Sequence, residues 1–360
     1  MDSSGRRILF LAWRSLAHPQ GGGSEVVTDR FLRGLQERGN TVALLAGGPT
    51  PDDSPYPVRS IGGRFSQYLR APFVARAGGP WDVIVDVENG IPYFSPLWQR
   101  APVVCFVNHV HLEQWPLYFP KPVALVGQTL EGRAMPRVYR HELYAVLSAS
   151  TRDALIDLGV EADRIRIVEV GVDPLPLVSV ARATEPTFVA LGRLVPHKRL
   201  ETLLRVWARV QPITGGQFVI VGDGPEMERL QAQAGSGVVF TGFVSSEEKA
   251  EWLHRAWLLV HGAMHEGWGL IVMEAGLAGT PTLAFDVHGI RDAAVAGETA
   301  VLVDSEDAFV EEWIRLAKDH AERERLGANA KRRSDEYTWD RTNAVFADVI
   351  DEAINRRQTR

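Results

Sequence analysis

Short apolar runs alternate with amphipathic stretches along nearly the whole chain of 360 residues. Residues 8–13 form an apolar run that predicts a buried strand, and residues 24–38 carry apolar side chains at helical spacing. Further buried strands are expected at 41–47, 82–87, 103–108 and 143–147. Because strands separated by helices imply crossover connections, the pattern predicts a parallel, doubly wound α/β sheet.

The alternation is interrupted once, near residues 171–176, and residues 174–186 have the composition of a linker. The restarted pattern predicts strands at 187–191, 217–221, 238–241, 258–261, 282–285 and 300–303, and helices at 200–210 and 270–277. We therefore expect two α/β domains joined by a hinge, the first over residues 1–172 and the second over residues 173–338.

Composition narrows the class of protein. With 45% hydrophobic residues the chain can bury a sizeable core, which excludes an intrinsically disordered protein. A net charge of −6 argues against a nucleic-acid partner, which would require a basic surface. Cys105 is the single cysteine, so no intrachain disulfide can form and the cytoplasm is the expected location. The apolar run after Arg7 ends at Arg14 and is too short for a signal peptide.

The sharpest chemical motif lies in residues 264–275, where Glu266 and Glu274 stand on either side of a Gly-x-Gly turn. Gly267 and Gly269 have no Cβ, so the backbone can approach a ligand closely there. The helix that follows presents amides at its start that suit a phosphate, and Glu274 could accept from both hydroxyls of a ribose. For this motif alone, a glycine-capped helix with two solvated carboxylates is the simpler interpretation.

Three further segments follow strands and contain basic residues or glycines. Arg193 and Lys198 share a loop that can aim both at one pyrophosphate, the arginine as a planar fork and the lysine as a point charge. The turn at residues 222–225 also follows a strand, and a glycine run at residues 20–25 precedes the first helix. Basic residues after a strand are often only solvated, so none of these segments identifies a function by itself.

Six motifs occur in a specific order: Gly-Gly-Ser-Glu, Gly-Val-Asp, Gly-Arg-Leu with Lys-Arg, Val-Gly-Asp-Gly-Pro, Phe-Thr-Gly-Phe-Val, and Glu-Gly-Trp-Gly-Leu with Glu-Ala. In this order they resemble retaining nucleotide-sugar glycosyltransferases of the GT-B fold, and most of all glycosyltransferase family 4. The resemblance is strongest over residues 187–304. It implies two Rossmann-like parallel-sheet domains facing an interdomain cleft, with a C-terminal helix at about 339–360 packing back on the first domain.

The resemblance assigns the nucleotide-sugar donor to the second domain. It implies that Glu274 holds the ribose, that Glu266 contacts the donor sugar, and that Arg193 and Lys198 clamp the diphosphate. The turn and helix start that would bind the donor phosphates comprise Gly267, Trp268, Gly269, Leu270 and Ile271. The remaining donor contacts would be Gly222, Gly224, Pro225, Gly242, Phe243 and Val244 around the base, and Gly22 and Gly23 in the first domain.

The acceptor is expected on the first domain, beside His109, which matches a histidine often found near the transferred sugar. His111, Trp115 and Gly22 are expected on the same side. The aromatic loop at residues 112–120 either stacks on a sugar or aglycone or fills core, and the sequence leaves both open. A metal at the two histidines is not expected, because no nearby carboxylate or cysteine completes a ligand set.

The implied reaction moves a glycosyl unit from a nucleoside diphosphate sugar to a carbohydrate, glycolipid or small-molecule acceptor, as in bacterial glycan or natural-product biosynthesis. The resemblance implies retention of the anomeric configuration, with Glu266, His109, Arg193 and Lys198 as catalytic residues. Because cationic side chains would replace a metal at the diphosphate, neither a cofactor nor a bound metal is expected. No nucleophile is evident in the first domain, which favours front-face substitution.

Residues 54–81 contain four arginines and no acidic residue. The arginines are Arg59, Arg64, Arg70 and Arg76. A solvated basic helix is the expected structure, and weak peripheral contact with anionic lipid is the alternative. No run in the chain approaches the roughly 20 apolar residues that span a bilayer.

Three rival functions are compatible with parts of the sequence. A nicotinamide-dependent dehydrogenase would use the turn at residues 222–224, but Met227 stands where its third glycine belongs. A nucleotide-sugar epimerase or phosphorylase would keep the fold and change the reaction. A non-catalytic sugar-binding relative is disfavoured by Glu266, Arg193 and Lys198. Residues 288–292 replace a more usual Gly-Gly-x-Pro-Glu, which bears on the identity of the donor.

Overall fold

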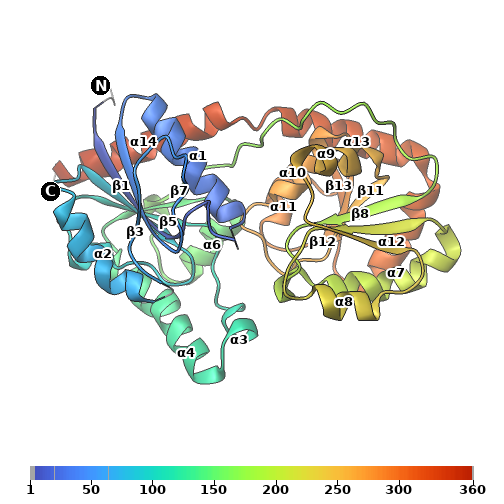
Figure 1. The fold of residues 1–360 in the computed structure, drawn as a ribbon, viewed down its shortest axis with the longest axis horizontal. Coiled ribbons are helices and arrows are strands. Elements are labelled where there is room, and N and C mark those ends of the chain that lie inside the picture. Colours follow the sequence, from blue (N-terminus) through green and yellow to red (C-terminus); the bar gives the residue numbers. More distant parts are fainter. Residues whose placement is uncertain (1–4, 20, 64, 359–360) are drawn as a thin grey trace. The chain divides into compact units, whose positions relative to one another are not determined.

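Two compact units, each built around its own parallel sheet, make up the chain (Figure 1). Unit 1 contains residues 1–171 and 339–360, so the C-terminal segment returns to the unit in which the chain begins. Unit 2 contains residues 172–338. In both sheets every neighbouring pair of strands is parallel, and the predicted α/β class with parallel sheets is confirmed.

The computed structural model describes residues 5–19, 21–63 and 65–358. Gln20, at the start of the glycine run, and Arg64, one of the four arginines of residues 54–81, lie outside these ranges. Among the residues within them, no helix combines the length and the apolar character that a membrane span requires.

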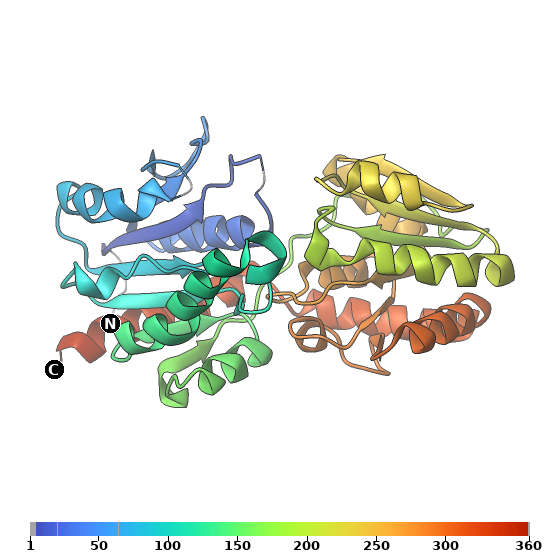
Figure 2. The same cartoon turned by 90° about the horizontal axis from the view of Figure 1, so that it is seen from below.

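The sheet of unit 1 has seven strands in the order β3-β2-β1-β4-β5-β6-β7. Helices cover both of its faces (Figure 2), so the inner strands are largely buried and mostly apolar, with Asp86 and Glu88 of β4 as buried exceptions. All five residues of β5 are buried, for example. The strands are β1 (Arg7–Arg14), β2 (Thr41–Gly47), β3 (Val58–Ser60), β4 (Val83–Glu88), β5 (Val103–Val107), β6 (Leu143–Val146) and β7 (Ile165–Ile167).

The connections of unit 1 include one π-helical turn, η2, which follows α4 directly and continues into α5. Such turns are rare in proteins, and those that occur are often found at functional sites. The helical elements are α1 (Gly23–Glu37), α2 (Ser66–Ala77), η1 (Ser95–Leu97), α3 (Trp115–Tyr118), α4 (Lys121–Thr129), η2 (Leu130–Ala134), α5 (Met135–Val138), α6 (Ala149–Asp157), η3 (Ala162–Arg164) and α14 (Trp339–Gln358).

Helix α14 is held in unit 1 by aromatic packing. Phe346 is fully buried, stacks on Phe31 of α1 with ring centroids 3.9 Å apart, and lies 6.2 Å from the ring of Phe106 in β5. Gly34 of α1 permits close approach of the two helices, because a Cβ there would lie 2.2 Å from the side chain of Asn343. These contacts explain why the last helix belongs to the first sheet.

The sheet of unit 2 has six strands in the order β10-β9-β8-β11-β12-β13. In Figure 1, α9, α10 and α13 lie on one face of this sheet, and α7, α8 and α12 on the other. The strands are β8 (Thr187–Leu191), β9 (Gln217–Val221), β10 (Val238–Gly242), β11 (Leu258–His261), β12 (Thr282–Phe285) and β13 (Ala300–Val303). The helices are η4 (Pro196–Lys198), α7 (Leu200–Thr214), α8 (Met227–Gln233), α9 (Ser246–Arg255), α10 (Leu270–Leu277), α11 (Ile290–Ala293), α12 (Glu306–Lys318) and α13 (His320–Asp335).

The core of unit 2 centres on the fully buried side chains of Trp207 and Trp313, whose ring centroids are 5.5 Å apart. Phe188 and Phe218, from neighbouring strands, pack edge-on to Trp313 at 5.3 and 5.4 Å. Rings in this arrangement bury large apolar areas and attract one another. The resulting rigid sheet fixes the loops at its carboxyl edge.

Helix α2 is the helix expected within residues 54–81, and apolar residues are exposed on it. Leu69 is 76% and Phe73 72% exposed, on a helix that also carries Arg70 and Arg76. Weak contact of this surface with anionic lipid stays a prediction.

Candidate functional site

Three polar side chains meet at the carboxyl edge of the unit 2 sheet. Glu266, in the loop between β11 and α10, forms an ion pair through Oε1 with the ammonium group of Lys198, at the end of η4. The same oxygen lies 2.9 Å from Nε2 of His261, which ends β11 and is 4% exposed. Because β8 and β11 are neighbours, the loops that follow them bring these groups together.

The electrostatics of this group keep Glu266 anionic. Burial by itself would raise the pKa of the Glu266 carboxyl, but the positive charge of Lys198 and the hydrogen bond from His261 outweigh it and hold the pKa well below its ordinary value. The carboxylate in turn holds the ammonium group of Lys198 at the site. His261 was not singled out from the sequence, because it reads as the last residue of an apolar strand.

Arg193 and Lys198 line one pocket, together with Gly192, His261 and Gly262. The loop thus places both residues at one pocket, and their binding of one pyrophosphate stays a prediction. The side chains of these two residues carry a guanidinium and an ammonium group, which suit a ligand with several anionic oxygens.

The glycines at residues 222–225 pack against the loop that contains Arg193. A Cβ at Gly222 would lie 2.0 Å from the carbonyl oxygen of Gly192, and a Cβ at Gly224 would lie 2.5 Å from that of Leu194. The amide of Leu194 also donates to the carbonyl of Asp223 at 2.9 Å. The two glycines thus let two backbone segments touch and fix the loop of Arg193. The expectation that they also line the base pocket stays a prediction.

Replacing Gly222 with alanine should lower the free energy of unfolding of unit 2 by about 2 kcal/mol or more, because the new methyl group meets backbone and the residue has φ +132°. Urea unfolding followed by tryptophan fluorescence measures the effect. Gly235→Ala is the matched control, since nothing lies within 4 Å of its Cβ position. Equal stabilities of the two variants would contradict this account of Gly222.

Glu274 of α10 has its own cationic partner. Its Oε1 accepts a hydrogen bond from Nζ of Lys249, on α9, at 2.9 Å, and both side chains are partly exposed. Gly269, which precedes α10, has φ +90°, a conformation that glycine adopts without strain. Lys249 was missed from the sequence because it is one basic residue among many on an amphipathic helix.

The other residues expected at the donor site differ in how far they are buried. The side chain of Trp268 is buried, at 3% exposure, and packs on Tyr337 with ring centroids 5.4 Å apart, so it anchors the turn. Phe243, directly after β10, is 89% exposed and open to a ligand. Gly242 and Val244 flank it and are partly buried, and Pro225 is exposed.

The unusual segment at residues 288–292 lies directly against Glu266. The amide of Glu266 donates to the carbonyl of His288 at 3.1 Å, and a Cβ at Gly289 would lie 2.1 Å from the carbonyl oxygen of Glu266. Residues 288–292 therefore hold the backbone of Glu266 in place. Their sequence affects which part of a donor the Glu266 carboxylate can contact.

In unit 1 the glycine run leads into α1. The amide of Gly22 donates to the Glu25 carboxylate at 2.7 Å. That amide therefore bonds within the start of α1, of which Gly23 is the first residue. The contact of Gly22 and Gly23 with a ligand stays a prediction. Asn108, after β5, donates to the Ser24 hydroxyl at 2.9 Å, so the glycine run lies beside the loop of the two histidines.

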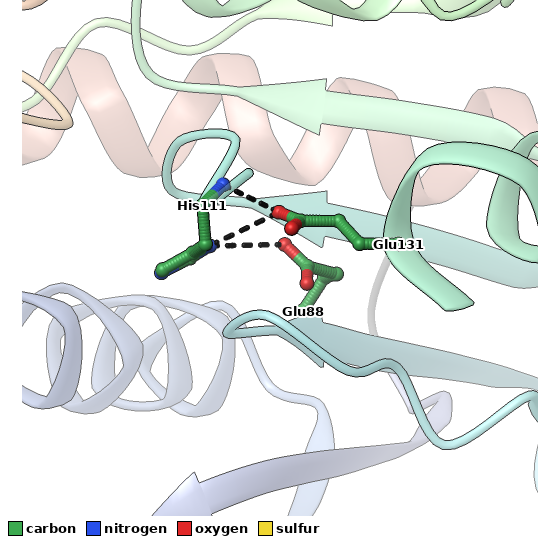
Figure 3. A group of neighbouring side chains, drawn as sticks. All are labelled: Glu88, His111 and Glu131. Atoms are coloured by element: carbon green, nitrogen blue, oxygen red, sulfur yellow. Dashed lines mark hydrogen bonds and ion pairs between the residues drawn. The ribbon is translucent and has the colours of Figure 1, made fainter. Parts of the chain in front are cut away.

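A buried cluster surrounds His111 in that loop (Figure 3). Nδ1 of His111 lies 3.3 Å from Oε1 of Glu131, in the π-helical turn, and 3.9 Å from Oε2 of Glu88, the last residue of β4. Both carboxylates are fully buried. The expectation that no carboxylate accompanies the histidines is therefore wrong. Glu88 lies near His111 because β4 and β5 are adjacent parallel strands, and the π-helical turn brings Glu131 to the same place.

Trp115 belongs to the same cluster. It is 8% exposed, and its indole Nε1 donates to Oε2 of Glu131 at 2.9 Å. A Cβ at Gly127 would lie 2.5 Å from the indole ring. The structure therefore favours the core-filling alternative and corrects the prediction that Trp115 contacts an acceptor. His109 is less enclosed: it is half-buried, its Nε2 lies 3.0 Å from Nε2 of Gln114, and its ring centroid lies 4.0 Å from that of His111.

The charge state of Glu88 is strongly perturbed. Burial raises the pKa of its carboxyl well above the ordinary value, and the negative charge of neighbouring Glu131 raises it further. Perturbed carboxyls of this kind gather at functional sites.

Comparison with known proteins gives matches along both units. The family described as Glycosyltransferase Family 4 matches residues 21–174, and the family described as Glycosyl transferases group 1 matches residues 177–333. A D-inositol 3-phosphate glycosyltransferase of Xylanimonas cellulosilytica is 29% identical over 245 residues, which cover 59% of this chain and 58% of that protein. The chain spans between 40% and 58% of the lengths of the first curated relatives that it matches.

Two solved structures show the same fold. Sucrose-phosphate synthase from Thermosynechococcus elongatus is similar with a TM-score of 0.79 and 19% sequence identity, over 96% of this chain and 98% of that chain. The Anabaena protein HepE, in a structure with UDP-glucose, is similar with a TM-score of 0.77 and 18% identity, over 96% of this chain and 100% of that chain.

Proposed function

The chain belongs to the family 4 type of glycosyltransferases and has their GT-B fold, and from this premise we propose that it moves a glycosyl unit from a nucleoside diphosphate sugar to an acceptor. The observation that carries the proposal is the pocket shared by Arg193 and Lys198, with the anionic Glu266 bonded to Lys198. Transfer builds negative charge on the departing diphosphate, and preorganised cations are the groups that stabilise it.

In this proposal each polar group of unit 2 has one task. Arg193 and Lys198 bind the diphosphate, and the first amides of α10 add hydrogen-bond donors for its oxygens. Glu274 accepts from the ribose hydroxyls, and Lys249 orients that carboxylate. Glu266 contacts the donor sugar and is itself oriented by His261.

We further propose that the transfer retains the anomeric configuration. The phosphate oxygen that leaves the sugar would accept the proton of the incoming acceptor hydroxyl on the same face, so the bond to phosphate breaks as the new glycosidic bond forms. His109, which is half-buried beside the buried cluster of unit 1, would orient the acceptor. Carbohydrates, glycolipids and small molecules all offer the hydroxyl that this reaction needs.

A product assay tests the proposal. UDP-glucose is the first donor to try, because the HepE structure holds it, followed by a panel of nucleotide sugars ranked by ligand-induced stabilisation. Nucleoside diphosphate should appear only when an acceptor is present, and NMR of the product should show the anomer of the donor. An epimerase would change the donor without releasing nucleotide, a phosphorylase would produce a sugar phosphate, and stabilisation by NAD alone would indicate a dehydrogenase.

Phe243 is expected to contribute to donor affinity by stacking on the base. Replacing it with alanine should raise the dissociation constant of the donor about fivefold, which corresponds to roughly 1 kcal/mol of lost stacking. Isothermal titration with the donor measures the change. Phe73→Ala, which removes another exposed phenylalanine from unit 1, is the matched control and should leave the constant unchanged. Equal affinities of the two variants would remove Phe243 from the base site.

Donor activation should not depend on added metal, because Arg193 and Lys198 supply the positive charge at the diphosphate. Adding Mg²⁺ or Mn²⁺ to the assay should change the initial rate by less than about twofold, as expected when no metal bridges the phosphates. Initial rates at increasing metal concentration provide the measurement. Turnover that begins only after such an ion is added would contradict this mechanism.

A further inference from the structure

Glu88, His111 and Glu131 offer one ligand atom each, and these three atoms all lie within 4.8 Å of one another. They come from three separate elements: the end of β4, the loop after β5, and the π-helical turn η2 (Figure 3). We propose that they form a binding site for one divalent transition-metal ion. This site lies within unit 1, whereas the proposed diphosphate ligands belong to unit 2.

The contact made by one ring nitrogen of His111, Nε2, determines whether the other nitrogen, Nδ1, is available to bind a metal ion. Nε2 lies 3.1 Å from Oδ1 of Asn89, which is an acceptor, so this contact is a hydrogen bond in the tautomer that has its hydrogen on Nε2. Nδ1 then faces the carboxylate oxygens of Glu131 and Glu88. In a neutral ring Nδ1 has a lone pair, and a metal ion placed between it and the two carboxyl groups would be bound by all three.

A proton on Nδ1 would satisfy only part of the cluster. It would serve Oε1 of Glu131 at 3.3 Å, but Oε2 of Glu88 lies 3.9 Å from Nδ1, beyond hydrogen-bond distance, and no side chain of the described residues donates to that carboxyl. The Glu88 side chain is fully buried, and a buried carboxyl that no side chain pairs is costly. A metal ion differs from a proton because it can bind Nδ1 and both carboxylates at once.

The surroundings are those of a metal site. A metal-bound histidine normally donates its other ring N–H to an oxygen, as His111 does to Asn89 in that tautomer. Glu131 is held by two donors, the amide of His111 at 2.5 Å and the indole of Trp115 at 2.9 Å. The π-helical turn directs this carboxylate to His111, and turns of this kind are frequent at functional sites.

The donor set selects the class of ion. One imidazole nitrogen with two carboxylates suits Zn²⁺ or Mn²⁺, whereas Mg²⁺ and Ca²⁺ prefer sites made of oxygen alone. Three protein ligands leave at least one position for water. The bound ion would tie β4, the histidine loop and η2 together, and thereby fix the loop from which His109 projects.

Metal binding by the full chain tests the proposal. The protein is dialysed against a chelator, then reloaded with Zn²⁺ or Co²⁺, and bound metal is counted by mass spectrometry after gel filtration. We expect one ion per chain, a Co²⁺ visible spectrum with imidazole and carboxylate ligands, and no retention of Mg²⁺ or Ca²⁺. Glu88→Gln and His111→Gln should each weaken binding at least about tenfold, as the loss of one ligand does.

Glu113→Gln is the matched control, because it makes the same change on the same loop at an exposed carboxylate, and it should bind metal as the wild type does. The melting temperature of the wild-type protein should rise with Zn²⁺, and this measurement needs no variant. Failure of the wild type to retain an ion, or Glu88→Gln binding as tightly as wild type, would overturn the proposal. None of these readouts uses turnover, so they are independent of the proposed function.

Discussion

Lys198→Ala is expected to reduce kcat/KM for the donor by about 10² to 10³-fold, the range found when one preorganised group is removed from a developing negative charge. The lysine is only 19% exposed and is held by Glu266, so its charge is both poorly screened and fixed in position. Most of the loss should fall on kcat, because the diphosphate carries more charge as it leaves than when it is bound to the sugar. Steady-state rates of nucleoside diphosphate release provide the measurement.

Lys331→Ala is the matched control for that experiment. Lys331 also forms an ion pair with a carboxylate, that of Asp335, but both side chains are 52% exposed on α13, away from the pocket that Lys198 lines. Its loss should leave the kinetics unchanged and stability within about 0.5 kcal/mol. If Lys198→Ala retains kcat/KM within about threefold of wild type, the lysine is not at the leaving group.

The parallel sheets were predictable because burial on both faces produces apolar runs that stand out from their surroundings. β5 and β12, for example, are buried along their whole length. The two short outer strands were missed for the opposite reason: β3 spans three residues, of which Arg59 and Ser60 are exposed, and β7 has one buried residue in three. Nothing in such short and mixed segments distinguishes a strand from a loop.

The candidate site was predictable where its members are close in sequence. Arg193 and Lys198 occupy one loop, so their spacing alone indicated a shared target. Glu88 and Glu131 could not be paired with His111 in that way, since their contact depends on the order of the strands and on a π-helical turn. A usable signal was present for Glu88, because it is an acidic residue at the end of an apolar strand.

Glycine motifs proved the least specific part of the sequence. Gly222 approaches Gly192, and Gly289 approaches Glu266, closer than any side chain would permit. A glycine that leaves room for another backbone segment looks the same in sequence as one that leaves room for a phosphate. Their presence in a fixed order identified the family, while their individual tasks required the structure.

Glu266→Gln is expected to lower activity by about 10²-fold, since it removes the anion that orients Lys198 and contacts the donor sugar in the proposed mechanism. The same change should destabilise unit 2 by about 2–3 kcal/mol at neutral pH, because Lys198 and His261 lose a charged partner that is only 17% exposed. Urea unfolding at pH 7 measures the second effect. Glu322→Gln, at a surface pair with Arg325, should cost less than about 0.5 kcal/mol.

The pH dependence of the stability difference between wild type and Glu266→Gln distinguishes an ionic role of Glu266 from a merely steric one. The pKa of Glu266 is lower in the folded chain than its ordinary value of 4.5, so the folded state binds its proton less readily than the unfolded state. The stabilisation is therefore complete above the unfolded pKa and is lost as pH falls through the folded pKa. The stability gap between wild type and Glu266→Gln should be constant from pH 8 to about 5.5 and then narrow with acidification. A gap that stays constant down to pH 3 would show that shape, and not charge, makes Glu266 matter to the fold.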